Sequence, residues 1–131
     1  MVNGRSKGAS AERELADLLT RWAAEVGVTL DLKRNLEQVR GGGHDLVGLE
    51  DYGMAVEVKR VEQLALGSWW QQACRQADAI QCRPVLAWRQ NRKPWAFRTR
   101  AWVYPAFSPL TVDLDETNFK LWFIGQIRSK L

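Results

Sequence analysis

The sequence predicts an α/β fold, in which a central mixed sheet carries helices on its faces. Three observations predict it: a helical apolar pattern over residues 10–26, two strand-like segments joined by a short turn at 50–53, and a second helical pattern between the strands at 54–60 and 84–89. A short turn favours an antiparallel hairpin, whereas a helix between two strands favours a parallel crossover. Both orientations are therefore expected in one sheet. The length of 131 residues suits a single domain covering residues 1–131, large enough to bury a core.

The first helix is expected from Ser10, as its N-cap, to about Val26, with Gly27 as the C-terminal stop. Glu12 lies beside the apolar stripe of this helix. Glu12 and Glu14 would compensate the helix dipole if they stand in its first turn. The apolar stripe itself consists of Ala11, Leu15, Leu18, Leu19 and Trp22.

The segment Val28–Arg34 alternates apolar and polar residues, which predicts a half-buried strand. A glycine loop at 41–43 follows, and Arg34 and Arg40 flank it. These arginines either face solvent or contact phosphates at the mouth of a cleft, with Arg34 the better candidate. The basic N-terminus, residues 1–9, is likewise either a frayed end or an arm that contacts a phosphate backbone.

Along the strand at 54–60, side chains alternate between the two faces, so Glu57 and Lys59 share one face. The hairpin would bring Asp45, at the start of the preceding strand, near Glu57. Two carboxylates beside a lysine form a hard-oxygen site for a divalent ion, with a cation next to it. The alternative is a surface salt bridge between Glu57 and Lys59 plus a turn aspartate, because exposed ion pairs are common and nearly inert.

The second half of the chain is less clearly patterned. A helix over 67–81 is expected to cover the sheet, and Pro84–Arg89 to form a buried parallel strand. Pro94–Arg100 interleaves aromatic and basic residues, which fits either nucleic-acid binding or a half-exposed edge strand protected by charge. Residues 101–116 are expected to be irregular, and 119–124 to be either a final strand or a segment packing on a partner subunit.

The composition favours a polyanionic partner inside the cell. The formal net charge is +4 and the isoelectric point is near 9.4. No segment has the roughly 18 consecutive apolar residues needed to span a bilayer, and the N-terminus lacks the apolar region of a secretory signal. Cys74 and Cys82 show neither a zinc spacing nor a disulfide framework. We therefore expect a cytoplasmic protein without a membrane partner.

Three motifs stand in one order along the chain: KGASAERE at residues 7–14, GHDLV at 43–47 and VEVK at 56–59. Together they resemble the PD-(D/E)XK nuclease superfamily, and within it the small archaeal-type Holliday junction resolvases and their phage relatives. The resemblance covers residues 5–90. One departure is His44, where the family usually has a proline that shapes the turn and is not a ligand.

The resemblance implies a restriction-endonuclease-like fold, a central mixed β-sheet flanked by helices, and a DNA endonuclease that depends on Mg²⁺ or Mn²⁺. It implies metal ligands at Asp45, Glu57 and the Val58 carbonyl, with Glu12 as an outer ligand that also belongs to the catalytic set. Lys59 would orient or deprotonate the attacking water, or counter the phosphate charge. The residues with which it would contact DNA are Arg5, Lys7, Arg13 and Gln72, in addition to Arg34 and Arg40 named above.

The implied reaction is hydrolysis of phosphodiesters in four-way DNA junctions, a step of recombination and repair. Two symmetric nicks require two active sites, and a homodimer with twofold symmetry provides them. Two alternatives remain: a nuclease of the same fold for flaps, ends or duplex sites, and a DNA-binding module that has lost activity. The retained Asp45, Glu57 and Lys59 argue against the inactive module, while the substrate's geometry depends on surface shape.

Overall fold

The computed structural model describes residues 4–36 and 43–131 of the protein, and side chains from Gly8 onward in the first of these ranges. Helix α1 (Gly4–Ala24) precedes β1 (Lys33–Arg34), β2 (Leu46–Val47), the short 3-10 helix η1 (Glu50–Tyr52) and β3 (Met54–Arg60). Helix α3 (Leu66–Ala79) leads to β4 (Arg83–Arg89), β5 (Ala96–Ala101), β6 (Leu110–Asp115) and α4 (Glu116–Arg128).

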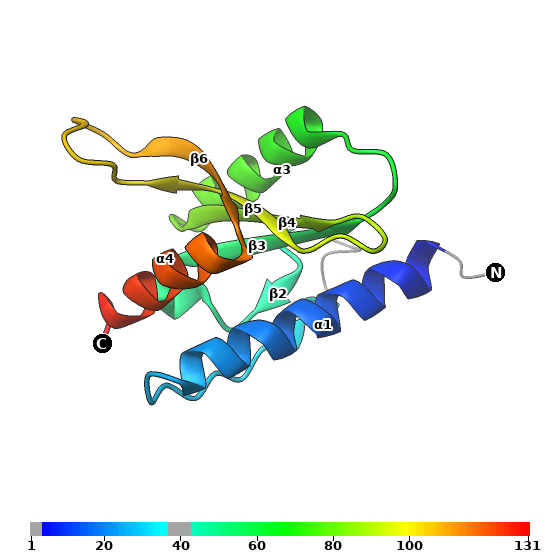
Figure 1. The fold of residues 1–131 in the computed structure, drawn as a ribbon, viewed down its shortest axis with the longest axis horizontal. Helices are drawn as coiled ribbons and strands as arrows, with labels where there is room; N and C mark the ends of the chain where they lie inside the picture. The colour runs from blue at the N-terminus through cyan, green and yellow to red at the C-terminus, as the bar shows by residue number, and fades with distance from the viewer. Residues whose placement is uncertain (1–3, 37–42) are drawn as a thin grey trace.

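The six strands form one sheet in the order β1-β2-β3-β4-β5-β6. Strands β3 and β4 are parallel and are connected by α3, and every other neighbouring pair is antiparallel. Helices α1 and α4 cover one face of the sheet and α3 covers the other (Figure 1). The predicted mixed α/β fold, with its hairpin and its parallel crossover, is confirmed.

The larger core lies between the sheet and helices α1 and α4. Phe97 of β5 stacks on Phe119 of α4 with ring centroids 3.9 Å apart, and Trp22 of α1 contacts both rings. The smaller core lies under α3, where Ala73 packs against Leu86 and Trp88 of β4. Successive residues of β3 and β4 therefore point into different cores, so these two strands are buried on both faces, whereas β5 buries only one face.

Helix α1 begins at Gly4, so the prediction of Ser10 as its N-cap is wrong. A capping residue only favours a start, and no proline between Gly4 and Ser10 prevents the helix from extending further. The predicted end is right: Gly27 has φ +79°, its N–H donates to Ala24, and the Val28 N–H donates to Ala23. These two bonds form a Schellman motif, which needs a left-handed residue at Gly27.

Only Lys33–Arg34 of the predicted strand 28–34 joins the sheet, although Val28 and Leu30 are buried as expected. The partner strand β2 has just two residues. Gly48 ends this pairing with φ +123°, and a Cβ atom there would lie 2.5 Å from the Asp31 carbonyl oxygen. A residue with a side chain could not pass so close to Asp31, so the glycine is required at this position.

The predictions for the C-terminal third are largely wrong. Strand β5 is paired on both sides and is not an edge strand; β6, in a segment expected to be irregular, forms the edge instead. The segment 119–124 is part of helix α4, so the prediction of a final strand is wrong, whereas packing on a partner subunit stays a prediction. The buried side chains of α4, Phe119, Phe123 and Ile127, repeat every four residues. The six residues 119–124 are too few to show this helical period in the sequence.

Local capping explains why α4 forms at this place. Asp115 accepts a hydrogen bond from the Asn118 N–H at 2.8 Å, which caps the helix, and Glu116 accepts one from the Trp95 N–H at 2.9 Å. The acidic cluster therefore has structural partners. No helix in the described part of the chain is long and apolar enough to cross a membrane.

Candidate active site

The candidate site lies on the β2–β3 hairpin. Asp45 immediately precedes β2, and its N–H donates to the Val56 carbonyl at 2.9 Å. The pairing of Leu46 with Val56 then brings Asp45 beside the stretch 57–58. The Asp45 carboxylate accepts a hydrogen bond from the Val58 N–H at 2.6 Å. The hairpin thus holds Asp45 against β3, next to Glu57.

Glu57 is a buried acid, with only 1% of its surface exposed beneath α3. Burial raises the pKa of this carboxyl to about 9, with further contributions from the hydrogen bond and the negative charge of Asp45; Lys59 and the Gln76 amide oppose the rise. Its Oε2 atom has no hydrogen-bond partner among the described residues. A buried carboxylate oxygen without a partner is costly, so this arrangement calls for a cation.

A divalent metal ion fits this pair of acids. Asp45 and Glu57 supply hard carboxylate oxygens, and an ion bound to them would satisfy the unpartnered Oε2 atom of Glu57. In residues 4–36 and 43–131, no three acidic, histidine or cysteine side chains converge on a common metal position. A site with two carboxylates suits Mg²⁺, which usually keeps several waters. When bound, such an ion would supply an activated water and neutralise phosphoryl charge.

Glu12 of α1 lies near Asp45 but does not form a three-residue metal-binding group with Asp45 and Glu57. Its Oε2 accepts a hydrogen bond from Arg34 Nε at 2.5 Å. Burial raises the pKa of Glu12 and the charge of Asp45 raises it further, while the hydrogen bond from Arg34 opposes the rise. Glu12 is therefore within electrostatic reach of Asp45, and it fixes the guanidinium of Arg34 on the rim of the site.

Lys59 shares the face of β3 that carries Glu57, and it forms no salt bridge with any residue that the structure describes. Its positive charge lowers the pKa of Glu57. Gln76 of α3 also acts on Glu57, although the sequence analysis selected Gln72 from this helix. The sequence could have indicated Gln76, because it follows Gln72 by four residues and residues four apart lie on one face of a helix.

The other predicted DNA-binding residues lie around the site as far as the structure describes them. Arg13 is exposed on α1, and its charge lowers the pKa of Glu12. Gln72 lines a hollow of about 590 Å³ between α3 and the segment before β2. Arg5 and Lys7 belong to the first turns of α1, with side chains outside the description, and Arg40 lies outside the described residues altogether.

Glu14 has a role that the sequence analysis missed. It pairs with Arg89 of β4, lies 3.7 Å from Arg60 Nη1 of β3, and accepts a hydrogen bond from Trp95 Nε1 at 3.3 Å. Because α1 begins at Gly4, Glu14 stands too far from the helix start to compensate the dipole. It instead joins α1 to the carboxyl ends of the two central strands.

His44 is also structural. Its Nε2 lies 2.7 Å from Oε1 of Glu50, and Oε2 of the same carboxylate accepts a hydrogen bond from the Gly48 N–H at 2.9 Å. Burial favours the neutral form of Glu50, but these hydrogen bonds hold its pKa below the usual value. The pair closes the turn between β2 and β3, so His44 supports the hairpin that carries Asp45, in place of the proline expected there.

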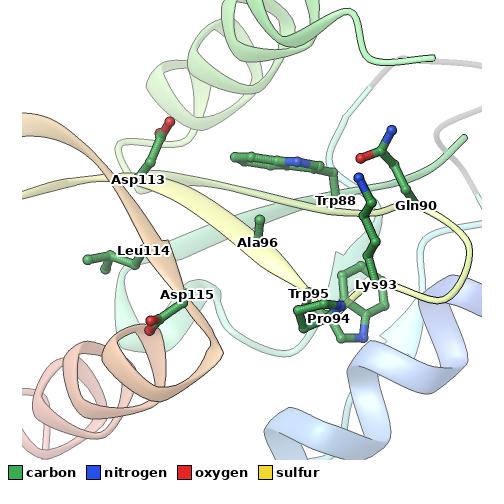
Figure 2. Close-up of a pocket in the computed structure, with 9 residues that line it drawn as sticks. All are labelled: Trp88, Gln90, Lys93, Pro94, Trp95, Ala96, Asp113, Leu114 and Asp115. Atoms are coloured by element: carbon green, nitrogen blue, oxygen red, sulfur yellow. The ribbon is translucent and has the colours of Figure 1, made fainter. Parts of the chain in front are cut away.

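An open cavity of about 390 Å³ lies over β4, β5 and β6, with Lys93 on one side and Asp113 on the other (Figure 2). Its floor includes Trp88, which is the register partner of Lys59, and Ala96. Asp45, Glu57 and Lys59 do not line it, so this cavity is separate from the candidate site.

An acid before one strand, a second acid in the neighbouring strand and a lysine two residues later define the PD-(D/E)XK class of nucleases. The sequence matches the family described as "Phage putative PDDEXK endonuclease" over residues 3–121. The chain belongs to this family of phage endonucleases, which confirms the resemblance found in its motifs.

A solved structure has the same fold. The Holliday junction resolvase Hjc of the archaeal hyperthermophile Archaeoglobus fulgidus superposes with a TM-score of 0.52 at 21% sequence identity, covering 88% of this chain and 89% of that chain. At this identity the likeness establishes the nuclease fold alone. No curated protein matches the sequence.

Proposed function

We propose that the protein is a metal-dependent DNA endonuclease that hydrolyses phosphodiesters in four-way junctions, acting as a homodimer of single nuclease domains, each covering residues 1–131. Membership of the phage endonuclease family supports cleavage of DNA. The observation that carries the proposal is the unpartnered, buried Oε2 atom of Glu57 beside Asp45, with Lys59 on the same face. Mg²⁺ is the proposed ion, and Mn²⁺ would bind the same oxygen ligands.

In this proposal Asp45, Glu57 and the Val58 carbonyl would hold the metal, with Glu12 as an outer ligand that belongs to the catalytic set. Lys59 would orient or deprotonate the attacking water or neutralise charge on the phosphate. Glu57 can hold a metal ion only as a carboxylate, so it would have to give up the proton that burial keeps on it.

The basic rim gives the proposed DNA contacts. Arg34, held by Glu12, would contact a phosphate next to the metal, and the exposed Arg13 would contact a neighbouring one. Gln72 would reach the DNA from the hollow beside α3. We also propose DNA contacts by Arg5 and Lys7 of the basic N-terminal segment and by Arg40 of the loop after Arg34.

Four-way junctions are the proposed substrate because the fold is shared with a protein described as a Holliday junction resolvase. The test is cleavage of a labelled four-way junction, with linear duplex and flap controls, in Mg²⁺ and in EDTA. Paired symmetric nicks on the junction alone, absent in EDTA, are expected. Preference for flaps or duplex would move the function to another nuclease, and binding without cleavage would indicate an inactive module.

Substitutions at the two acids test the site itself. Asp45→Asn and Glu57→Gln should each reduce cleavage to the level seen in EDTA, while junction binding is largely retained. The matched control is Asp51→Asn, an exposed acid in η1 of the same hairpin. Cleavage by both site variants at the rate of the control would remove Asp45 and Glu57 from the mechanism.

A further inference from the structure

The segment between β5 and β6 exposes an unusual amount of apolar surface. This arm, residues 102–110, exposes 60% of Trp102, 95% of Tyr104 and all of Phe107, together with 44% each of Val103 and Leu110. It extends as a hairpin beyond the rest of the ribbon, on the side where α4 ends (Figure 1). Contiguous exposed apolar surface of this kind marks an interaction site.

The arm is anchored at its base. Ala101 of β5 pairs with Leu110 of β6, and the Ala106 N–H donates to the Val103 carbonyl at 2.8 Å within the arm. The aromatic side chains are thus presented on a hydrogen-bonded frame. A partner that covers them meets a surface that is already formed, which lowers the entropic cost of association.

The charge pattern argues that the arm contacts protein and not DNA. No charged residue stands between Arg100 and Asp113. At the base of the arm, Arg98 pairs with Asp113 at 2.6 Å and Arg100 with Asp78 at 3.3 Å. Binding to DNA depends mainly on cations that neutralise phosphates, and the arm offers none. An apolar protein surface is the occupant that fits.

A complementary pocket lies at the base of the same arm. This arm pocket has a volume of about 290 Å³ and lies between Trp102 and the C-terminal half of α4, where Trp122 and Gly125 line it. A cavity of about 150 Å³ is enough to hold benzene, so the arm pocket has room for one aromatic ring. The remaining lining residues are Arg83, Gln126 and Ser129.

The position of these two features identifies a second copy of the chain as the partner. The aromatic rings stand at the tip of the arm and the arm pocket stands at its base. If two arms run antiparallel, the tip of each reaches the base of the other, and one twofold axis satisfies both contacts. A closed, self-complementary pair of this kind uses the same patch on both protomers.

The exposed rings supply much of the area that a specific pair needs. A large aromatic side chain buries 150–250 Å², so Trp102, Tyr104 and Phe107 together offer roughly 450 Å² per protomer at their exposures. A symmetric pair would therefore bury roughly 900 Å² in total from these rings alone, which is close to the roughly 1,000 Å² expected of a specific interface.

We propose that the arm is the dimerisation element of the protein, with the ring of Phe107 of one protomer inserted into the arm pocket of a second copy and Tyr104 packed beside it. This inference rests on the proposed function in one respect, because it names the surface that forms the homodimer proposed there. The arm extends from β5 and β6 away from β2, which follows Asp45 (Figure 1). We therefore expect pairing through the arms to leave both candidate sites uncovered.

The test measures molar mass against concentration by sedimentation or light scattering. The wild-type chain should show twice the 15.0 kDa of one protomer. The tip variant Tyr104→Ser/Phe107→Ser should weaken dimerisation at least about 30-fold, as expected for the loss of a 2 kcal/mol hot spot. Both residues are exposed, so the variant should fold as the wild type does.

The pocket variant is Gly125→Leu, matched by the control Gly67→Leu. A Cβ atom at either glycine would meet nothing within 4 Å, so each position has space where the new side chain begins. Leucine also favours a helix over glycine, so the folded protomer should not be destabilised. Gly125→Leu should weaken the dimer by filling the pocket, and Gly67→Leu should leave it unchanged.

A mixture of the tip variant and the pocket variant provides the sharpest test. Each variant alone loses both contacts of its homodimer, whereas the mixed dimer keeps one intact arm and one open pocket facing each other. We expect the mixture to dimerise at least about tenfold more tightly than either variant alone. Equal weakness of all three samples would overturn the arm-to-pocket arrangement.

Three further outcomes would overturn the proposal: a wild-type chain that stays monomeric at all concentrations, a tip variant that dimerises as the wild type does, and a tip variant that keeps its dimer but loses affinity for junction DNA. The last would make the arm a DNA contact. Cleavage of DNA is measured separately. A dimer without metal-dependent cleavage would refute the proposed function alone. Metal-dependent cleavage by a tip variant that still dimerises as the wild type does would refute this interface alone.

Discussion

The buried acid Glu57 should make the metal-free protein lose stability as the pH rises. In the unfolded chain this carboxyl ionises near pH 4.5, whereas in the folded chain burial raises its pKa to about 9. Between these values the folded state binds the extra proton. Its stabilising effect is therefore complete below pH 4.5 and is lost progressively as the pH rises toward 9.

The magnitude follows from the size of the shift. Each pH unit inside this window changes the free energy of unfolding by about 1.4 kcal/mol, so the step from pH 6 to pH 8 should cost about 3 kcal/mol. Because Glu57 is almost fully buried, solvent screening should not weaken this dependence. Glu57→Gln has no charge to bury, so this contribution to the slope should disappear in the variant.

The assay is urea unfolding at pH 6, 7 and 8 in EDTA, repeated in Mg²⁺. Metal at 100 times its dissociation constant should stabilise the wild type by about 2.7 kcal/mol and the Glu57→Gln variant by much less. Asp17→Asn, an exposed acid on α1, is the matched control and should behave as the wild type. Parallel pH profiles for wild type and Glu57→Gln, with equal gains from Mg²⁺, would refute the reasoning.

Two further predictions concern DNA contact and the core. Arg34→Ala should weaken binding to DNA and lower the slope of binding affinity against salt concentration by about 1, because one phosphate contact is lost. A binding titration at several salt concentrations measures this slope, and an unchanged slope would exclude the contact. The control is Arg128→Ala, at an exposed position on α4. Phe119→Ala should cost about 3–5 kcal/mol in urea unfolding, since Phe119 stacks on Phe97 in the core, whereas the exposed Leu121→Ala should change stability little; equal losses in the two variants would contradict this core.

The hairpin that carries the candidate site was predictable because its signals are local. Asp45, Glu57 and Lys59 are brought together by one short turn and by the alternation of side chains along a strand, and both are visible in the sequence. The C-terminal stop of α1 at Gly27 is local in the same sense, since the left-handed residue and its two hydrogen bonds lie within six residues. Nothing distant is needed to form either feature.

Other parts of the site could not be predicted because their partners are distant in the chain. Glu14 meets Arg89 and Trp95 only after the sheet has formed, 75 and 81 residues away. Gln76 acts on Glu57 only once α3 has folded over β3. The burial that raises the pKa of Glu57 likewise depends on that helix, so no pattern in the strand itself reveals it.

The sequence by itself determined the order of the main elements up to β4 and the hairpin that brings Asp45 near Glu57, because periodicity and short turns act over a few residues. Its three motifs carried the resemblance to the class of nuclease, which the family match confirms. Only the tertiary structure decided that β5 is internal and that residues 119–124 are helical, since β6 and the core contacts of α4 override weak local preferences. It also decided that the arm between β5 and β6 stays uncovered, because an apolar residue counts as exposed only after every possible partner in the chain has been placed.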